Sequence, residues 1–135
     1  MINDVKHFHE KFGHLVNTQP THLTVRKLLE RVECMQEELD EFTDAVYAQN
    51  MEEQADALVD LVYFTLGTAV MLGIPFQILW DDVHRANMQK VRGIGKRGHL
   101  VDCIKPDGWI GPQTKTILKS AGYTGHNPID EVDDE

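Results

Sequence analysis

The segment 55–74 is almost entirely apolar, yet two aspartates, Asp56 and Asp60, interrupt it. A carboxylate that moves from water into a helical core raises the free energy by several kcal/mol unless a cation or hydrogen-bond donors compensate. Compensating side chains are scarce, because Arg31 is the only lysine or arginine within residues 28–84. A bound divalent metal ion is the counter-charge that this pattern favours.

Hydrophobic periodicity predicts an all-α chain. Apolar residues recur at helical spacing in four consecutive segments joined by short links, which is the pattern of a four-helix-bundle protomer. The expected helices cover roughly 2–16, 21–48, 50–73 and 75–91. An irregular C-terminal extension rich in glycine follows, with a short helix near 112–121 and no recognisable strand pattern.

Single residues mark the ends of the third helix. Asn50 is its expected N-cap, Glu53 has the position of a capping partner, and Gly73 is the expected stop. We place one helical domain at residues 1–122. The remaining residues, 123–135, form an acidic tail that we expect to be solvated and disordered.

Composition and charge indicate an oligomer and argue against a membrane span, a nucleic-acid partner and a zinc site. The third helix is apolar on several faces, so one small bundle cannot cover it, and we expect a homo-oligomer, either a dimer or a tetramer. The longest uncharged run, residues 61–80, is interrupted by Gly67, Gly73 and Pro75, which argues against a membrane span. The formal charge of −9 disfavours nucleic acid as a partner. Two cysteines without C-x-x-C spacing argue against zinc or a disulfide framework and fit a reducing cytoplasm.

Acidic side chains gather at helical spacing on the second and third expected helices. Residues three, four or seven positions apart lie on neighbouring turns of one face, so such carboxylates can share a cation. Oxygen ligands with few nitrogen or sulfur alternatives select Mg²⁺, with Mn²⁺ able to substitute. A solvated charged face is the ordinary alternative for Glu37, Glu38 and Glu41. The candidates are Glu37, Glu38, Glu41, Glu53, Asp56 and Asp60.

A basic stretch follows the fourth expected helix. No acidic residue occurs within 83–101, so an anion such as a phosphate group would bind there most readily. Neighbouring glycines make a mobile, solvated loop the alternative for its last two cations. The basic residues are Arg85, Lys90, Arg92, Lys96 and Arg97.

Four elements taken in order resemble the MazG-like all-α nucleoside triphosphate pyrophosphohydrolases, in particular the short, single-domain, phage-type members. The resemblance covers roughly residues 4–121. The matching elements are Glu38-x-x-Glu41, Glu53-x-x-Asp56, Asp60-Leu-Val-Tyr63 and Asn87-x-x-Lys90.

The resemblance implies an oligomeric helical bundle that uses Mg²⁺ to hydrolyse a nucleoside triphosphate between its α- and β-phosphates. It implies Glu38, Glu41, Glu53 and Asp56 as metal ligands, and it gives Glu37 the role of a further ligand or of the base that orients water. Asp60 lies one turn after the second acidic motif, so we assign it to a contact with the metal ligands or with the nucleoside, with a ligand role as the alternative, and Tyr63 is a candidate substrate contact. The leaving pyrophosphate would be bound by Asn87, Lys90, Arg92, Lys96 and Arg97.

Three other functions compete with this one. A pyrophosphohydrolase acting on another phosphoribosyl nucleotide would use the same residues. A non-catalytic helical adaptor would explain the composition, but it leaves Asp56 and Asp60 unexplained. A di-iron carboxylate bundle needs Glu-x-x-His motifs, and the nearest match is Asp81-x-x-His84. The aromatic residues Tyr63, Trp80 and Trp109 fit either base stacking or core packing.

Overall fold

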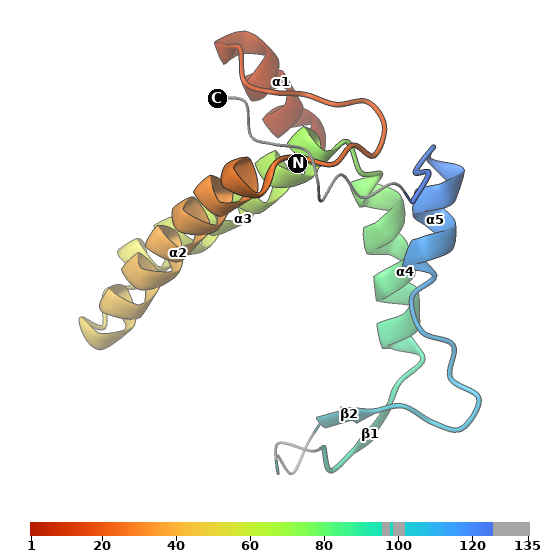
Figure 1. The fold of residues 1–135 in the computed structure, drawn as a ribbon. Coiled ribbons are helices and arrows are strands. Elements are labelled where there is room, and N and C mark those ends of the chain that lie inside the picture. Colours follow the sequence, from red (N-terminus) through yellow and green to blue (C-terminus); the bar gives the residue numbers. More distant parts are fainter. Residues whose placement is uncertain (96–97, 99–101, 126–135) are drawn as a thin grey trace.

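The computed structural model describes residues 1–95, 98 and 102–125 (Figure 1). The prediction of an all-α helical bundle is confirmed, with one small sheet added to the helices. The predicted acidic tail begins within the described residues, but 126–135 lie outside them. The elements are α1 (Ile2–Phe12), α2 (Val25–Tyr47), α3 (Met51–Leu72), α4 (Phe76–Met88), β1 (Val91–Gly93), β2 (Asp102–Ile104) and α5 (Thr114–Ser120).

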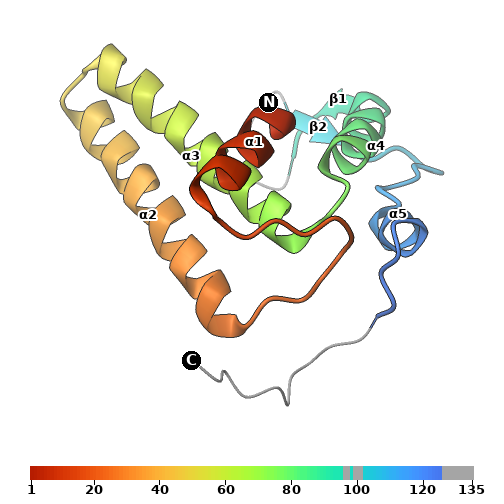
Figure 2. The ribbon, with the colours of Figure 1, turned by 90° about the horizontal axis from the view of Figure 1, so that it is seen from above.

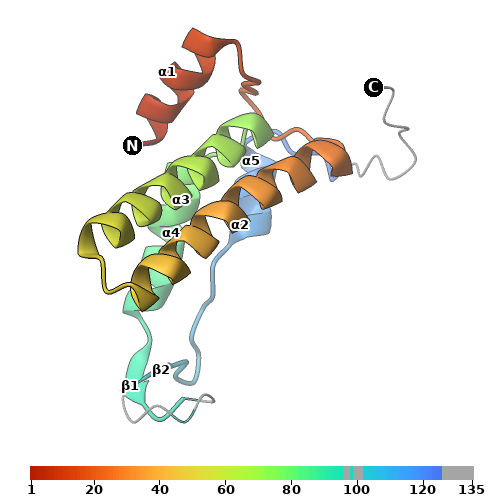
Figure 3. The same ribbon diagram turned by 90° about the vertical axis from the view of Figure 1, so that its left-hand side faces the viewer.

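The centre of the fold is a hairpin of two long helices, α2 and α3, which pack side by side along their length (Figure 3). Asn50 makes the tight link possible. Its side-chain Oδ1 accepts the backbone N–H of Glu53 at 3.1 Å, and its own N–H donates to the carbonyl of Ala45 at 3.0 Å. The predicted N-cap of the third helix is therefore confirmed, and the link forces α2 and α3 to run antiparallel.

Helix α1 crosses the C-terminal half of α3 and closes the small core there (Figure 2). The core consists of Val5, Leu66 and Val70, against which Ile2, Val16 and Phe76 pack. The link between α1 and α2 adds hydrogen bonds to the same end of α3. Asn17 Nδ2 donates to the carbonyl of Met71 at 2.6 Å, so this end of α3 is the anchored one.

The helices on either side of the α1–α2 link, α1 and α2, are both shorter than the sequence predicts. α1 ends at Phe12 because Gly13 adopts the left-handed conformation, with φ 70°. α2 begins only at Val25, where Thr24 Oγ1 caps the helix by accepting the N–H of Lys27 at 3.2 Å. The intervening residues take part in the contacts with α3 and cannot extend either helix.

After Pro75 the chain leaves the hairpin. In Figures 1 and 2, α4 lies on the opposite side of the molecule from the body of α2 and α3 and packs against α5. We call α4, β1, β2, α5 and the described residues that join them the arm. The predicted helix 75–91 ends at Met88, and β1 begins three residues later.

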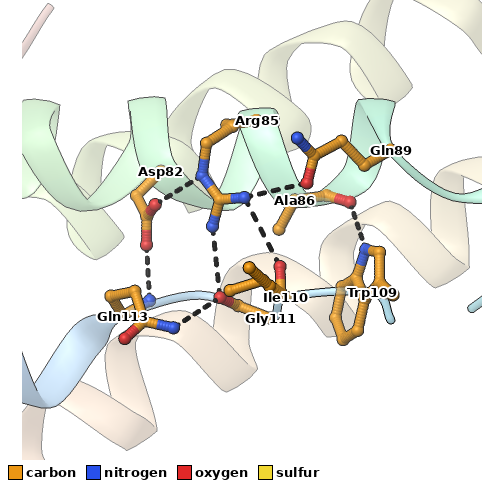
Figure 4. A network of polar contacts seen from close by, with 8 residues as sticks. All are labelled: Asp82, Arg85, Ala86, Gln89, Trp109, Ile110, Gly111 and Gln113. Atoms are coloured by element: carbon orange, nitrogen blue, oxygen red, sulfur yellow. Dashed lines mark hydrogen bonds and ion pairs between the residues drawn. The ribbon is translucent and has the colours of Figure 1, made fainter. Parts of the chain in front are cut away.

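The arm holds itself together with polar contacts between α4 and the segment before α5 (Figure 4). Arg85 donates to the carbonyls of Ile110 at 3.4 Å and Gly111 at 3.1 Å. Asp82 accepts from Arg85 Nε at 2.9 Å and from the N–H of Gln113 at 2.6 Å. These contacts lower the pKa of Asp82, first through the Gln113 N–H and then through Arg85. The arm is thus a unit with its own internal bonds.

The arm contains two short strands, although its sequence shows no recognisable strand pattern. β1 and β2 pair antiparallel, with Val91 opposite Ile104 and Gly93 opposite Asp102. Each strand has three residues, which is too short for an alternating pattern to be recognisable in a sequence.

The protomer leaves much apolar surface exposed. Only seven hydrophobic residues among those described are buried, and three of them are in the α1–α3 core. By length and composition alone α3 could cross a membrane, but its N-terminal half carries acidic residues and it packs on α1 and α2. An incompletely covered α3 agrees with the expectation that one protomer cannot bury all its faces.

Candidate active site

Four carboxylates meet across the seam between α2 and α3. Glu38 and Glu41 lie on adjacent turns of α2, and Asp56 and Asp60 lie on adjacent turns of α3. Because the helices are antiparallel, the C-terminal half of α2 faces the N-terminal half of α3. The negative charges of Glu41, Asp60 and Asp56 all act on Glu38. The structure therefore brings these four predicted residues together, and we call them the acidic cluster.

Two members of the acidic cluster, Glu38 and Asp60, have raised pKa values. Burial raises the pKa of Glu38 most, and a hydrogen bond with Glu41 and the charges of Glu41, Asp60 and Asp56 raise it further. Burial also raises the pKa of Asp60, followed by the charges of Asp56 and Glu41. Two carboxyl groups can hydrogen-bond to each other only when one holds a proton. When both carboxyls are ionised, the negative charges of the cluster need another compensating group, which a metal cation would supply.

One side-chain oxygen of Glu38 allows a test of whether the acidic cluster fits a cation. Glu38 Oε2 is fully buried without a hydrogen-bond partner, the only such side-chain atom in the part of the chain that the structure describes. A buried, unsatisfied polar atom costs about 1–3 kcal/mol, and a charged one more. A divalent cation would satisfy this oxygen and neutralise the charges around it.

The residues fit Mg²⁺ or Mn²⁺ by their chemistry. All four are hard oxygen donors, and Mg²⁺ needs only one or two carboxylates because water and phosphate oxygens complete its shell. Among the residues described, no three histidine, cysteine, aspartate or glutamate side chains converge closely enough to hold an ion in this conformation. Glu41 and Asp56 are exposed, so their side chains can turn toward an ion without disturbing the packing.

Glu37 and Glu53 lie outside the acidic cluster. Both side chains are exposed, and neither contributes to the pKa shifts of Glu38 or Asp60. The position of Glu53 is set by Asn50, which caps its backbone N–H. Glu53 remains a predicted ligand and Glu37 a predicted base, while Asp60, predicted as a contact with the metal ligands or with the nucleoside, lies among the ligand candidates.

Tyr63 lies one turn beyond Asp60, on the α1 side of α3. Its ring meets Phe8 edge-on, with centroids 5.5 Å apart. It also lines an apolar groove of about 350 Å³ between α1 and α3, together with Val5, Leu58 and Val62. A groove with this apolar lining has room for an uncharged chemical group.

The predicted phosphate-binding residues lie on the arm. Asn87 is in the last turn of α4, Lys90 follows that helix, and Arg92 is in β1. Lys96 and Arg97 lie outside the described residues. The arm runs away from the α2–α3 hairpin (Figures 1 and 2). A single protomer therefore does not bring its acidic and basic candidates together.

Trp109 organises the cations of the arm. Its indole Nε1 donates to the carbonyl of Ala86 at 2.7 Å, which fixes the ring against α4 (Figure 4). Lys90 Nζ lies 5.6 Å and Lys105 Nζ 5.0 Å from the ring centroid. Neither ammonium forms an ion pair with a carboxylate among the described residues.

Arg31 is a residue of the seam that the sequence analysis did not assign to the site. It lies two turns before Glu38 on the same face of α2, a spacing that could have indicated it. Its Nε donates to Thr68 Oγ1 at 3.1 Å and its Nη2 to the carbonyl of Phe64 at 3.0 Å. Burial lowers its pKa. The only lysine or arginine within residues 28–84 thus donates to neutral acceptors. The negative charge of the acidic cluster therefore has no basic side chain from this segment to balance it.

Comparison with known proteins identifies one family. The family model described as phosphoribosyl-ATP pyrophosphohydrolase matches residues 5–87. The match covers α2, α3, most of α1 and nearly all of α4, and so includes the acidic cluster and Asn87. No curated protein matches the chain.

Proposed function

This chain belongs to the phosphoribosyl-ATP pyrophosphohydrolase family, a family of all-α nucleotide pyrophosphohydrolases, and we propose that it cleaves a nucleotide between its α- and β-phosphates with the help of Mg²⁺. The proposed products are a nucleoside monophosphate and pyrophosphate. The observation that carries the proposal is the buried, unpartnered Glu38 Oε2 within four carboxylates that have no cation among them.

Two substrates are consistent with this site. The MazG-like motifs favour a ribo- or deoxynucleoside triphosphate, whereas the family match favours phosphoribosyl-ATP. Both carry the same triphosphate, so the same residues would act on either. They differ in the group attached to the base, which the apolar groove beside Tyr63 would have to accommodate or leave in solvent.

The proposed metal ligands are Glu38, Glu41 and Asp56, with Asp60 beside them and Glu53 as a further candidate. A bound Mg²⁺ or Mn²⁺ would neutralise charge on the phosphates and polarise the bond that breaks. Glu37, exposed one residue before Glu38, is the proposed base that receives the proton of the attacking water.

The basic residues of the arm have a complementary role. Cleavage between the α- and β-phosphates leaves negative charge on the departing pyrophosphate, and ammonium or guanidinium groups stabilise that charge. Asn87, Lys90 and Arg92 are the described candidates for this role. We further propose that the chain works as a homo-oligomer in the cytoplasm and that residues 1–122 form its domain.

A substrate panel tests the proposal. The chain is incubated with Mg²⁺ and, separately, with each ribo- and deoxynucleoside triphosphate and with phosphoribosyl-ATP, and the products are resolved by ion-exchange chromatography. We expect pyrophosphate from at least one of them. Turnover of phosphoribosyl-ATP alone would assign the second substrate. Mg²⁺ binding without turnover of any of them would point to a different pyrophosphate-containing substrate, whereas neither Mg²⁺ binding nor turnover would favour the helical adaptor.

A further inference from the structure

We propose that Trp109 positions two lysines, Lys90 and Lys105, as a binding site for the pyrophosphate group of the nucleotide. Trp109 is the positioning residue, and Lys105 is a second phosphate-binding cation beside Lys90. Both Trp109 and Lys105 lie beyond the residues 5–87 that match the family model. The inference rests on the proposed function, because pyrophosphate is the product that the proposed cleavage releases.

A tight turn brings Lys105 to the ring of Trp109. The backbone N–H of Trp109 donates to the carbonyl of Pro106 at 3.0 Å. Gly108, inside this turn, has φ 75°, a conformation that glycine adopts without strain. The chain therefore reverses between Lys105 and Trp109, and the Lys105 ammonium lies 5.0 Å from the centroid of the indole ring.

The indole N–H of Trp109 caps the end of α4. The last carbonyls of a helix lack their full set of backbone partners, and α4 ends at Met88. The carbonyl of Ala86 accepts the N–H of Gln89 at 3.3 Å and the indole Nε1–H of Trp109 at 2.7 Å (Figure 4). The ring is thus fixed where Lys90 leaves the helix, and Lys90 Nζ lies 5.6 Å from its centroid.

Packing against Gly111 holds the ring as well. A Cβ added at Gly111 would lie 3.1 Å from Cζ3 and 3.2 Å from Cη2 of Trp109, so the backbone there runs close to the indole. The carbonyl of Gly111 in turn accepts from Arg85 at 3.1 Å. The orientation of the ring is therefore set both by its hydrogen bond to α4 and by its contact with the segment before α5.

The two ammonium groups favour a ligand with several negative charges. Lys90 and Lys105 both approach one ring, whose face attracts cations. Neither lysine forms an ion pair with a carboxylate in the part of the chain that the structure describes. Like charges gathered in this way repel each other, and an anion beside them offsets the repulsion. A pyrophosphate group is large enough to contact both ammonium groups at once.

The ring also lowers the entropy loss that binding requires. A free lysine side chain has many rotamers, and fixing them opposes binding. Contact with the indole restricts Lys90 and Lys105 before an anion arrives. Removing the ring should therefore weaken binding of the anion even though both positive charges remain.

A titration without metal tests the site directly. The indole N–H signal of Trp109 in the ¹⁵N-labelled chain is assigned with Trp80→Phe, and inorganic pyrophosphate is added in EDTA, so that no metal at the acidic cluster can recruit the anion. We expect a saturable shift of the Trp109 signal. Lys105→Gln should weaken pyrophosphate binding at least about fivefold. Lys115→Gln, which changes an exposed lysine of α5, should leave the affinity unchanged.

Sodium chloride at the same ionic strength is the control for general screening and should give no saturable shift. The inference is overturned if pyrophosphate gives no saturable shift, if chloride gives the same one, or if Lys105→Gln and Lys115→Gln bind pyrophosphate equally well.

Steady-state kinetics test whether Trp109 acts through the lysines. Trp109→Leu removes the ring face and should raise KM about tenfold with less than about threefold change in kcat, because the lysines contact phosphates both before and during the reaction. Trp109→Phe keeps an aromatic face without the N–H donor, so its KM should rise less. Equal KM values for Trp109→Leu and the parent would contradict the positioning role.

A double variant separates positioning from a purely structural role. Lys90→Gln combined with Trp109→Leu should raise KM by less than the product of the two single effects, since the ring acts partly through Lys90. Single effects that multiply fully would overturn the positioning role. A parent that turns over no nucleotide would contradict the proposed function alone, and the pyrophosphate titration would still decide whether the anion site exists.

Discussion

Glu38 of α2 and Asp60 of α3 face each other across the seam of the helical hairpin, close enough that the charge of Asp60 raises the pKa of Glu38. Their positions follow from the antiparallel packing that the Asn50 link imposes. Helical proteins seldom gather carboxylates in this way without a compensating cation. The pair therefore connects the fold of the hairpin to the proposed metal chemistry.

The first prediction concerns the pH dependence of stability without metal. The folded state raises the pKa values of Glu38 and Asp60, so it binds more protons than the unfolded chain. The stability that these groups contribute is complete below the unfolded pKa values of about 4 and is lost as pH rises through the folded ones.

Glu38→Gln should accordingly raise the unfolding temperature by a few degrees at pH 7.5 in EDTA, and the gain should shrink toward pH 4. Differential scanning fluorimetry across this range measures the difference from the parent. Asp40→Asn, which changes an exposed carboxylate bonded to Gln36, is the matched control. A gain that does not depend on pH would show that the Glu38 carboxylate is not under electrostatic strain.

The second prediction concerns metal binding. Mg²⁺ or Mn²⁺ should stabilise the folded chain, by about 2.7 kcal/mol at a hundred times the dissociation constant, because the ion binds a cluster that exists only when α2 and α3 pack. Thermal unfolding with and without Mn²⁺ measures the effect. Asp56→Asn should remove most of it. An equal effect of Mn²⁺ on the parent and on Asp56→Asn would place the ion elsewhere.

The third prediction concerns catalysis. Glu41→Gln and Asp56→Asn keep the side-chain shape but remove a ligand charge, so each should reduce turnover at least about a hundredfold, equivalent to roughly 2.7 kcal/mol of activation free energy. Circular dichroism should show that both variants stay folded. Asp40→Asn again serves as the control and should keep parental turnover. Two fully active amide variants would mean that these carboxylates have only a structural role.

The fourth prediction separates backbone strain from packing at two glycines with nearly the same conformation. Gly13 has φ 70° and open space around its Cα, whereas Gly73 has φ 68° and lies against the backbone of Gln19. Gly13→Ala should therefore lower the free energy of unfolding by about 1 kcal/mol through backbone strain alone. Gly73→Ala should lower the free energy of unfolding considerably more, because the backbone of Gln19 must also move away from the added methyl group. Urea unfolding of both variants measures this, and equal losses would contradict the contact with Gln19.

The helical hairpin was predictable because its signals are local. Asn50 and Gly73 are residue types that commonly cap helices, and α3 begins and ends within one residue of the limits predicted from the sequence. The faces of α2 and α3 follow from helical periodicity, so grouping Glu38 and Glu41 with Asp56 required only that the helices be antiparallel neighbours. For the same reason the broader class of all-α nucleotide pyrophosphohydrolases could be anticipated from the spacing of these acids, although the family that matches is not the MazG-like one expected.

The arm and the surroundings of Arg31 depend on contacts between residues far apart in the sequence. The direction of α4 is set by Arg85 and Asp82 bonding to residues 110–113, and no local pattern encodes those contacts. Arg31 is the one basic residue near the acids in the sequence, but its guanidinium binds Thr68 and the carbonyl of Phe64. Whether a cation neutralises an acid depends on three-dimensional distance, which periodicity alone does not supply.

The most direct test of the account is the identity of the products formed by the parent and by Glu38→Gln under the same conditions. Each is incubated with Mg²⁺ and the substrate that the panel identifies, and phosphate products are followed by ³¹P NMR. The account predicts that the parent releases the monophosphate and pyrophosphate in equal amounts and that Glu38→Gln releases neither at a comparable rate. Release of orthophosphate by the parent, or undiminished pyrophosphate release by Glu38→Gln, would contradict it.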